Sequence, residues 1–62
     1  PTVELSIPVS DGKTLAQAYR DSEVLDRRDT DTKVVITARA TRAQIGAWEQ
    51  QPEIGVQVFK DT

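Results

Sequence analysis

The 62-residue chain contains no cysteine, no histidine and no methionine, and it has only one tryptophan, one tyrosine and one phenylalanine. Without cysteine it forms no disulfide, and without cysteine or histidine it lacks the usual ligands of a structural zinc site. The commonest general base and the thiolate nucleophile are missing as well. These absences argue against a free-standing enzyme, and we expect no catalytic residue, no metal site and no cofactor.

Long apolar runs and an excess of positive charge are also missing. No apolar stretch approaches the roughly 20 residues that cross a bilayer, and nothing resembles a signal peptide. We therefore expect a cytoplasmic protein without a membrane partner. The net charge is −2 and the pI is about 4.9, which disfavours a dedicated nucleic-acid-binding domain. The start at Pro1 and the absence of methionine favour a single small domain, residues 1–62, from a longer protein.

Alternating apolar and polar residues predict the first strand, in residues 2–9, with Val3, Leu5, Ile7 and Val9 on one side. Pro8 cannot donate a backbone hydrogen bond, which places it at the outer end of the strand. The following Ser10-Asp11-Gly12 is typical of a turn, and Ser10 or Asp11 can cap a helix.

Two segments have the spacing of amphipathic helices. The first covers residues 13–22, and its apolar face includes Leu15 and Tyr19. The second begins at a capping box, Thr41 followed three residues later by Gln44, and it runs to about Gln50. Because Tyr19 and Trp48 lie on apolar faces, we expect both rings in the core; the other expected core residue of the second helix is Ile45.

Three further strands complete the pattern. Residues 23–29 and 32–40 are separated by a Thr30-Asp31 turn and predict a β-hairpin, with the first arm as a charged edge strand. Residues 53–59 alternate again after Pro52, although the pattern does not say whether they pair with the first strand. The order strand-helix-strand-strand-helix-strand predicts an α+β, ferredoxin-like split βαβ fold, with two helices on one face of a four-stranded antiparallel sheet.

The candidate contact residues are four cations of the hairpin: Arg27, Arg28, Lys33 and Arg39. Lys33, Arg39 and one of the two adjacent arginines can project from its outer face. One interpretation is cross-strand pairing with acidic neighbours on a solvated edge, which the residues favour. The other is a weak, backbone-directed contact to RNA or to a protein partner. The outer face carries no expected aromatic residue, so it does not resemble an RNA-recognition motif.

Two other groups of residues partly match known binding motifs. Asp26, Asp29 and Asp31 superficially match the start of a calcium loop, but the glycine and the terminal glutamate of that pattern are missing. The three glycines are too far apart for a phosphate-binding loop. We interpret the aspartates as solubilising residues of the edge strand and its turn.

Residues 3–49 contain an apolar strand ending in "IPVSDG" and then "YRDSEVLDR", in which a helix runs directly into a Glu-Val-Leu strand. An alternating strand, "KVVITARAT", and a short helix follow. This order resembles the C-terminal domain of the HflX family of ribosome-associated GTPases. The chain departs from the family after that helix, because it continues with "PEIGVQVFKDT" where the family's tail usually ends.

The resemblance implies a non-catalytic C-terminal accessory domain of a GTP-binding protein. Its partners would be its own GTPase domain, which holds the nucleotide site, and the large ribosomal subunit. The resemblance transfers no functional residue to this chain. Two alternatives stay open: a translation-factor-type ribosome-binding module, and a ferredoxin-like regulatory module that dimerises. The sequence leaves the oligomeric state undecided.

Overall fold

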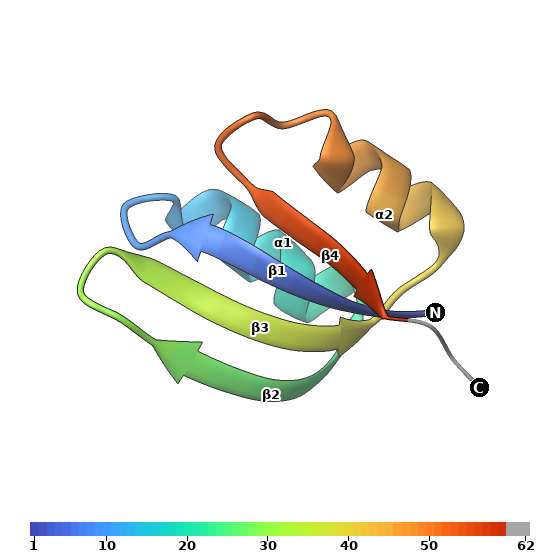
Figure 1. The fold of residues 1–62 in the computed structure, drawn as a ribbon, viewed down its shortest axis with the longest axis horizontal. Helices are drawn as coiled ribbons and strands as arrows, with labels where there is room; N and C mark the ends of the chain where they lie inside the picture. Colours follow the sequence, from blue (N-terminus) through green and yellow to red (C-terminus); the bar gives the residue numbers. More distant parts are fainter. Residues whose placement is uncertain (60–62) are drawn as a thin grey trace.

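The computed structural model describes residues 1–59, which form six elements in the predicted order (Figure 1). These elements are β1 (Thr2–Pro8), α1 (Gly12–Asp21), β2 (Glu23–Asp29), β3 (Lys33–Arg39), α2 (Arg42–Glu49) and β4 (Gly55–Phe59). Their bounds differ from the sequence-based ones by at most two residues. The last three residues of the predicted domain lie outside the described part of the chain.

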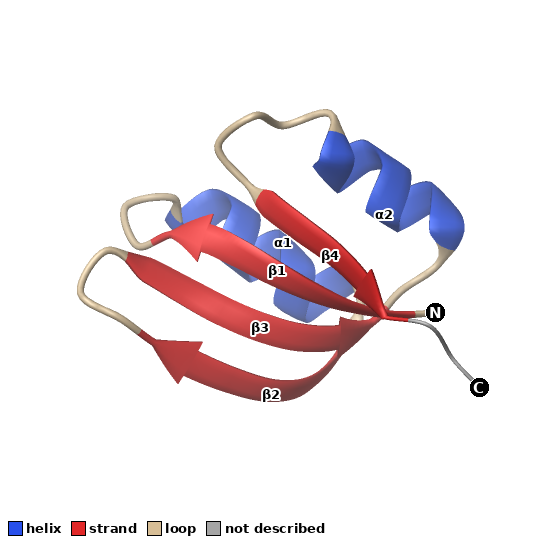
Figure 2. Ribbon diagram, viewed as in Figure 1, coloured by secondary structure: helices blue, strands red, loops and turns tan. Residues whose placement is uncertain are grey.

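The four strands form one antiparallel sheet with the order β2-β3-β1-β4 (Figure 2). α1 links β1 to β2 and α2 links β3 to β4, so each helical connection skips one intervening strand. The helices pack on one side of the sheet, which we call the helix side. The predicted ferredoxin-like split βαβ arrangement is therefore confirmed. Neither helix within residues 1–59 has the length and apolar character needed to span a membrane.

The core is the layer between the two central strands and the helices. β1 and β3 supply six side chains that are at most 1% exposed: Val3, Leu5, Ile7, Val34, Ile36 and Ala38. The helices and adjoining loops complete this layer with Ala18, Ala40, Ile45, Trp48 and Ile54. Each fully buried Val, Leu or Ile contributes about 1.5–3 kcal/mol from the hydrophobic effect. The central strands therefore carry most of the stabilising burial, and the edge strands β2 and β4 carry little.

Val9 corrects the sequence-based view of β1. The alternation predicts Val9 in the core, and this prediction is wrong because Val9 is 58% exposed. β1 ends at Pro8, where the chain turns, and the Val9 N–H donates a hydrogen bond to the Thr32 carbonyl oxygen at 2.9 Å. The period of 2 applies only while the backbone is extended, so it no longer governs the residue after the strand.

Both helices begin at side-chain caps. Asp11 accepts hydrogen bonds from the Thr14 backbone N–H at 3.2 Å and from the Thr14 hydroxyl at 2.7 Å, which selects Asp11 over Ser10 as the cap of α1. At α2 the capping box is present. The Gln44 N–H donates to the Thr41 hydroxyl at 3.2 Å, and the Gln44 side chain accepts from the Thr41 N–H at 2.9 Å. These bonds satisfy backbone donors that the helices leave unpaired.

β4 joins the sheet as an edge strand. It pairs antiparallel with β1, from Thr2 opposite Phe59 to Ser6 opposite Gly55. This pairing answers the question that the sequence left open. The opposite edge of the sheet is β2, which pairs only with β3 among the described strands.

We expect Leu5→Ala to destabilise the domain by about 2–5 kcal/mol, because Leu5 is 0% exposed and sits on the central strand. A domain this small is only marginally stable, so a loss at the upper end of that range leaves it largely unfolded. Urea unfolding followed by Trp48 fluorescence measures the change. Val9→Ala is the matched control: its exposed side chain predicts a change within about 0.5 kcal/mol. Equal losses in both variants would contradict this assignment of the core.

Candidate functional site

The side of the sheet opposite the helices, here called the open face, is where the sequence places its candidate contacts. Alternation along each strand, combined with the strand registers, assigns this face a mainly polar set of residues. They are Thr2, Glu4, Ser6 and Pro8 of β1, Glu23, Asp26 and Arg28 of β2, Lys33, Val35, Thr37 and Arg39 of β3, and Gly55, Gln57 and Phe59 of β4.

A register shift in β2 decides where the two adjacent arginines go. Val24 pairs with Ala38, but the next paired residue is Asp26, opposite Thr37, so Leu25 is an extra residue. A bulge of this kind reverses which face the following side chains occupy. Arg28, opposite Val35, therefore lies on the open face, whereas Arg27 lies on the helix side. The structure brings Arg28, Lys33 and Arg39 to one face and separates Arg27 from them.

Arg27 binds neighbouring side chains on the helix side of the sheet. Its guanidinium donates to both carboxylate oxygens of Asp29, at 2.7 and 3.1 Å, and to the Tyr19 hydroxyl of α1 at 3.3 Å. The guanidinium carbon also lies 6.0 Å from the centre of the Tyr19 ring, within cation–π range. Arg27 therefore connects the edge strand to the helix.

Tyr19 is not a core residue, so the prediction that its ring is buried is wrong: its side chain is 45% exposed. The ring belongs to the part of α1 that faces the charged strand β2, where Arg27 covers it in place of an apolar side chain. Trp48 is 3% exposed, and the same prediction is confirmed for that ring.

Charge on the open face is balanced. Its three cations, Arg28, Lys33 and Arg39, share the face with three carboxylates: Glu4, Glu23 and Asp26. Arg39 lies 3.7 Å from its cross-strand neighbour Glu23, an exposed ion pair of the kind that contributes little to stability. Within residues 1–59 no ion pair is formed by Arg28 or Lys33, which adjoin the β2–β3 turn. Among the described residues, the cations of this face that form no ion pair therefore lie at that end.

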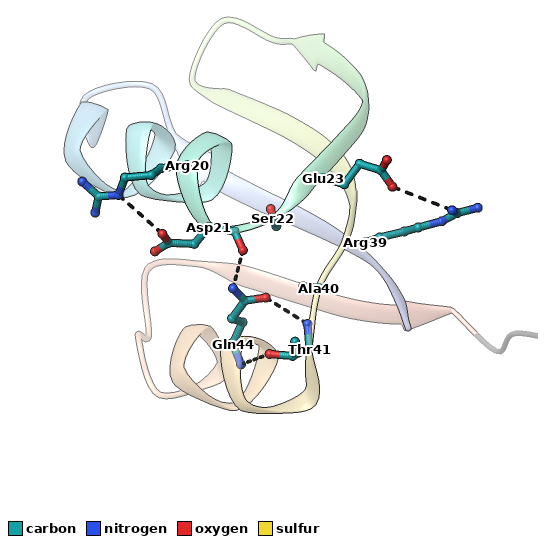
Figure 3. A pocket seen from close by; sticks show the side chains of 8 residues that line it. All are labelled: Arg20, Asp21, Ser22, Glu23, Arg39, Ala40, Thr41 and Gln44. Atoms are coloured by element: carbon teal, nitrogen blue, oxygen red, sulfur yellow. Dashed lines mark hydrogen bonds and ion pairs between the residues drawn. The ribbon is translucent and has the colours of Figure 1, made fainter.

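A shallow pocket of about 520 Å³ lies where α1 ends and α2 begins (Figure 3). It is lined by Arg20, Asp21, Ser22, Glu23, Arg39, Ala40, Thr41 and Gln44. Its polar groups largely satisfy one another: Arg20 pairs with Asp21 at 3.4 Å, and the Gln44 amide donates to the Asp21 carbonyl oxygen. In Figure 3 Arg20 and Arg39 extend to opposite sides, so the two cations do not converge on a ligand.

The described residues assemble no metal-binding cluster. Within residues 1–59 no three His, Cys, Asp or Glu side chains come together as metal ligands. The bulge separates the aspartates of β2, because Asp26 lies on the open face and Asp29 on the helix side. No side-chain nitrogen or oxygen buried in this part of the chain lacks a hydrogen-bond partner, so none is left aimed at an absent group.

Comparison with models of protein families, with curated protein sequences and with solved structures finds no significant match for this chain.

Sequence reasoning missed two features of the site. Phe59 lies on the open face opposite Thr2, so the face does hold one aromatic ring, at its β4 edge. The alternation of residues 55–59 would have placed Phe59 there once pairing with β1 was known. The Arg27 contact with Tyr19 was missed because it depends on the bulge, for which the sequence carries no signal that we can identify.

We expect the Asp29 carboxyl to report the Arg27 contact. Hydrogen bonds from Arg27 hold the pKa of Asp29 below its ordinary value, and the same bonds, followed by the one to Tyr19, raise the pKa of Arg27. A lowered folded-state pKa favours folding above the unfolded value of about 3.9, and this contribution is lost as pH falls through the folded-state pKa. In Arg27→Gln the Asp29 pKa should rise toward its ordinary value, measured by NMR titration of the carboxyl carbon.

Arg28→Gln is the matched control for this titration, since it removes the same charge from the neighbouring residue on the opposite face. It should leave the Asp29 pKa nearly unchanged. An equal rise in both variants would show a general loss of positive charge and would contradict the specific contact.

Proposed function

We propose that this domain is a non-catalytic accessory module of a GTP-binding, ribosome-associated protein of the HflX type. In this proposal it docks on its own GTPase domain and on the large ribosomal subunit. The observation that carries the proposal is the segment "YRDSEVLDR", residues 19–27, whose helix-to-strand spacing resembles that family.

The geometry of this segment gives its spacing a physical reason. α1 ends at Asp21 and β2 begins at Glu23, so a single residue, Ser22, joins helix to strand. The Ser22 hydroxyl and N–H both donate to the Ala18 carbonyl oxygen, at 2.6 and 3.1 Å, and close the helix without a loop. Tyr19 and Arg27, at the two ends of the segment, then meet across this tight connection.

A docking role agrees with the chemistry of the described residues. Residues 1–59 hold no cluster of three potential metal ligands, and the three glycines are too far apart for a phosphate-binding loop. The Thr14 hydroxyl meets the Asp11 carboxylate as part of a helix cap, so a module that binds is favoured over one that catalyses. No element of residues 1–59 covers the open face, whose described residues are mainly polar and balanced in charge. Such a surface suits a protein partner first, with phosphate contacts limited to the cations near the β2–β3 turn.

We expect the full-length parent protein to co-sediment with purified large ribosomal subunits, and neutralising the three open-face cations to weaken this association. Arg28→Gln, Lys33→Gln and Arg39→Gln together should lower the slope of log affinity against log salt by about one unit for each lost phosphate contact. Sedimentation at two salt concentrations measures both effects. Unchanged binding and slope would contradict a phosphate-contacting role for this face.

The matched control for this experiment replaces three exposed cations of the helices, Lys13, Arg20 and Arg42, by Gln. It removes the same total charge from outside the open face. A similar loss of binding in both triple variants would indicate a general electrostatic effect. Failure of the unaltered parent protein to bind the subunits would overturn the ribosomal part of the proposal.

A further inference from the structure

The two edges of the sheet differ in how they are protected against pairing with another strand. β2 carries a bulge and four consecutive charged residues, 26–29, both of which discourage edge-to-edge association. β4, "GVQVF", has no charge, no proline and no register shift in its pairing with β1. Within residues 1–59 no strand pairs with the outer edge of β4. Both outer edges are unpaired among the described strands, and β4 is the one without protective features.

The pattern of β4 is complementary to itself. If two copies pair antiparallel with Gln57 opposite Gln57, then Val56 faces Val58 and Gly55 faces Phe59 of the other copy. Apolar residues meet apolar residues on the helix side, and no like charges meet anywhere along the five-residue strand. Val58 and Phe59 are 48% and 37% exposed, so both have apolar surface left to bury.

A depression lies where the second Phe59 would be placed. A pocket of about 220 Å³ opens between β1 and β4, lined by Glu4, Ser6, Gly55, Val56 and Gln57. Its floor exists because Gly55 has no side chain: a Cβ there would come within 3.1 Å of the Ser6 Cβ. In the pairing described above, the aromatic ring of one copy covers the glycine of the other, an arrangement that rescues edge glycines in sheets.

Gly46 supplies an independent observation from α2. A glycine inside a helix costs roughly 0.5–1 kcal/mol relative to alanine. Residues 1–59 give no reason for it, because its backbone φ is not positive and an added Cβ would meet nothing within 4 Å. A contact outside the monomer would provide the missing reason.

The position of Gly46 on α2 indicates where that contact lies. Successive helical residues are about 100° apart, so Gln44 and Gly46 flank the buried Ile45 on opposite sides. Gln44 points toward α1, since its amide binds the Asp21 carbonyl oxygen. Gly46 therefore faces away from α1, outward past β4, beside which α2 lies (Figure 1).

From these observations we propose that β4 is a docking edge for a second copy of this chain. The two β4 strands join antiparallel about a two-fold axis at Gln57, and the two α2 helices approach each other closely at Gly46. The result is a continuous eight-stranded sheet. This inference is independent of the proposed role in ribosome association, which the experiments below do not test.

The contact is small, so the dimer should depend on concentration, with a dissociation constant on the order of 100 μM, in the range of transient interfaces. Sedimentation equilibrium at ~20 μM and ~1 mM should show the mass rising from monomer toward dimer. Val58→Lys should abolish the rise, because a charge on the edge opposes pairing. Leu25→Lys, on the other edge and equally exposed at 48%, should not. If the mass is still that of the monomer at the higher concentration, a second copy of this chain is not the partner of β4.

Gly46→Gln separates folding from association. It should stabilise the monomer against urea, since it improves helix propensity and its Cβ meets nothing within 4 Å, yet it should weaken the dimer at least tenfold. Ala47→Gln, one residue further and exposed, should leave dimerisation unchanged. If Gly46→Gln dimerises as strongly as the unaltered chain, the approach of the two helices is wrong.

A single cysteine tests the position of the two-fold axis, because the chain contains none of its own. Directly opposed residues of antiparallel strands have Cα atoms about 4.5–5.5 Å apart, which suits a disulfide. Gln57→Cys should therefore form a covalent dimer when oxidised glutathione accepts the two electrons released. Gln17→Cys, on α1, should remain largely monomeric. Equal cross-linking in both variants, or none in Gln57→Cys, would overturn the proposed register.

Discussion

The fold depends on the burial of the inner faces of β1 and β3 beneath the two helices. These strands are central, so both of their edges are paired and their inward side chains are almost completely removed from water. A chain of 62 residues has no room for a second apolar layer. The outer strands consequently contribute few core residues. Their sequences are therefore less constrained by burial and can differ in how they protect an exposed strand edge.

The two edges use that freedom in opposite ways. On β2 the charges 26–29 and the bulge after Val24 make pairing unfavourable, and the bulge also commits Arg27 to the contact with Tyr19. The same shift leaves Arg28 on the open face with Lys33. The extra residue in β2 thus places the two adjacent arginines on opposite faces: Arg27 in a structural contact and Arg28 on an accessible surface. β4 has neither charge nor bulge, so its exposed backbone remains suited to pairing.

Hydrophobic periodicity predicted every element and the fold class. Each central strand and each helix has one buried face, so its apolar residues recur with the period of that strand or helix. Periodicity failed where contacts with another segment decide whether a side chain is buried. Val9 continues the alternation of the sequence, but its side chain is exposed because the strand ends at Pro8. Tyr19 has helical spacing, yet the side chain that contacts it from the adjoining strand β2 is an arginine. Which of Arg27 and Arg28 faces outward depends on pairing with β3, information that no local pattern contains.

A small core also links docking to folding. A partner that binds only the folded domain stabilises it by RT ln(1 + [L]/Kd), about 2.7 kcal/mol at a hundredfold excess over Kd. For a marginal domain this is a large fraction of the total stability. In the proposed function, a GTPase domain in the same polypeptide would act at a high effective concentration, so even a weak contact would be well occupied. Modest contacts made by a polar, charge-balanced face can therefore be enough to stabilise a domain with so small a core.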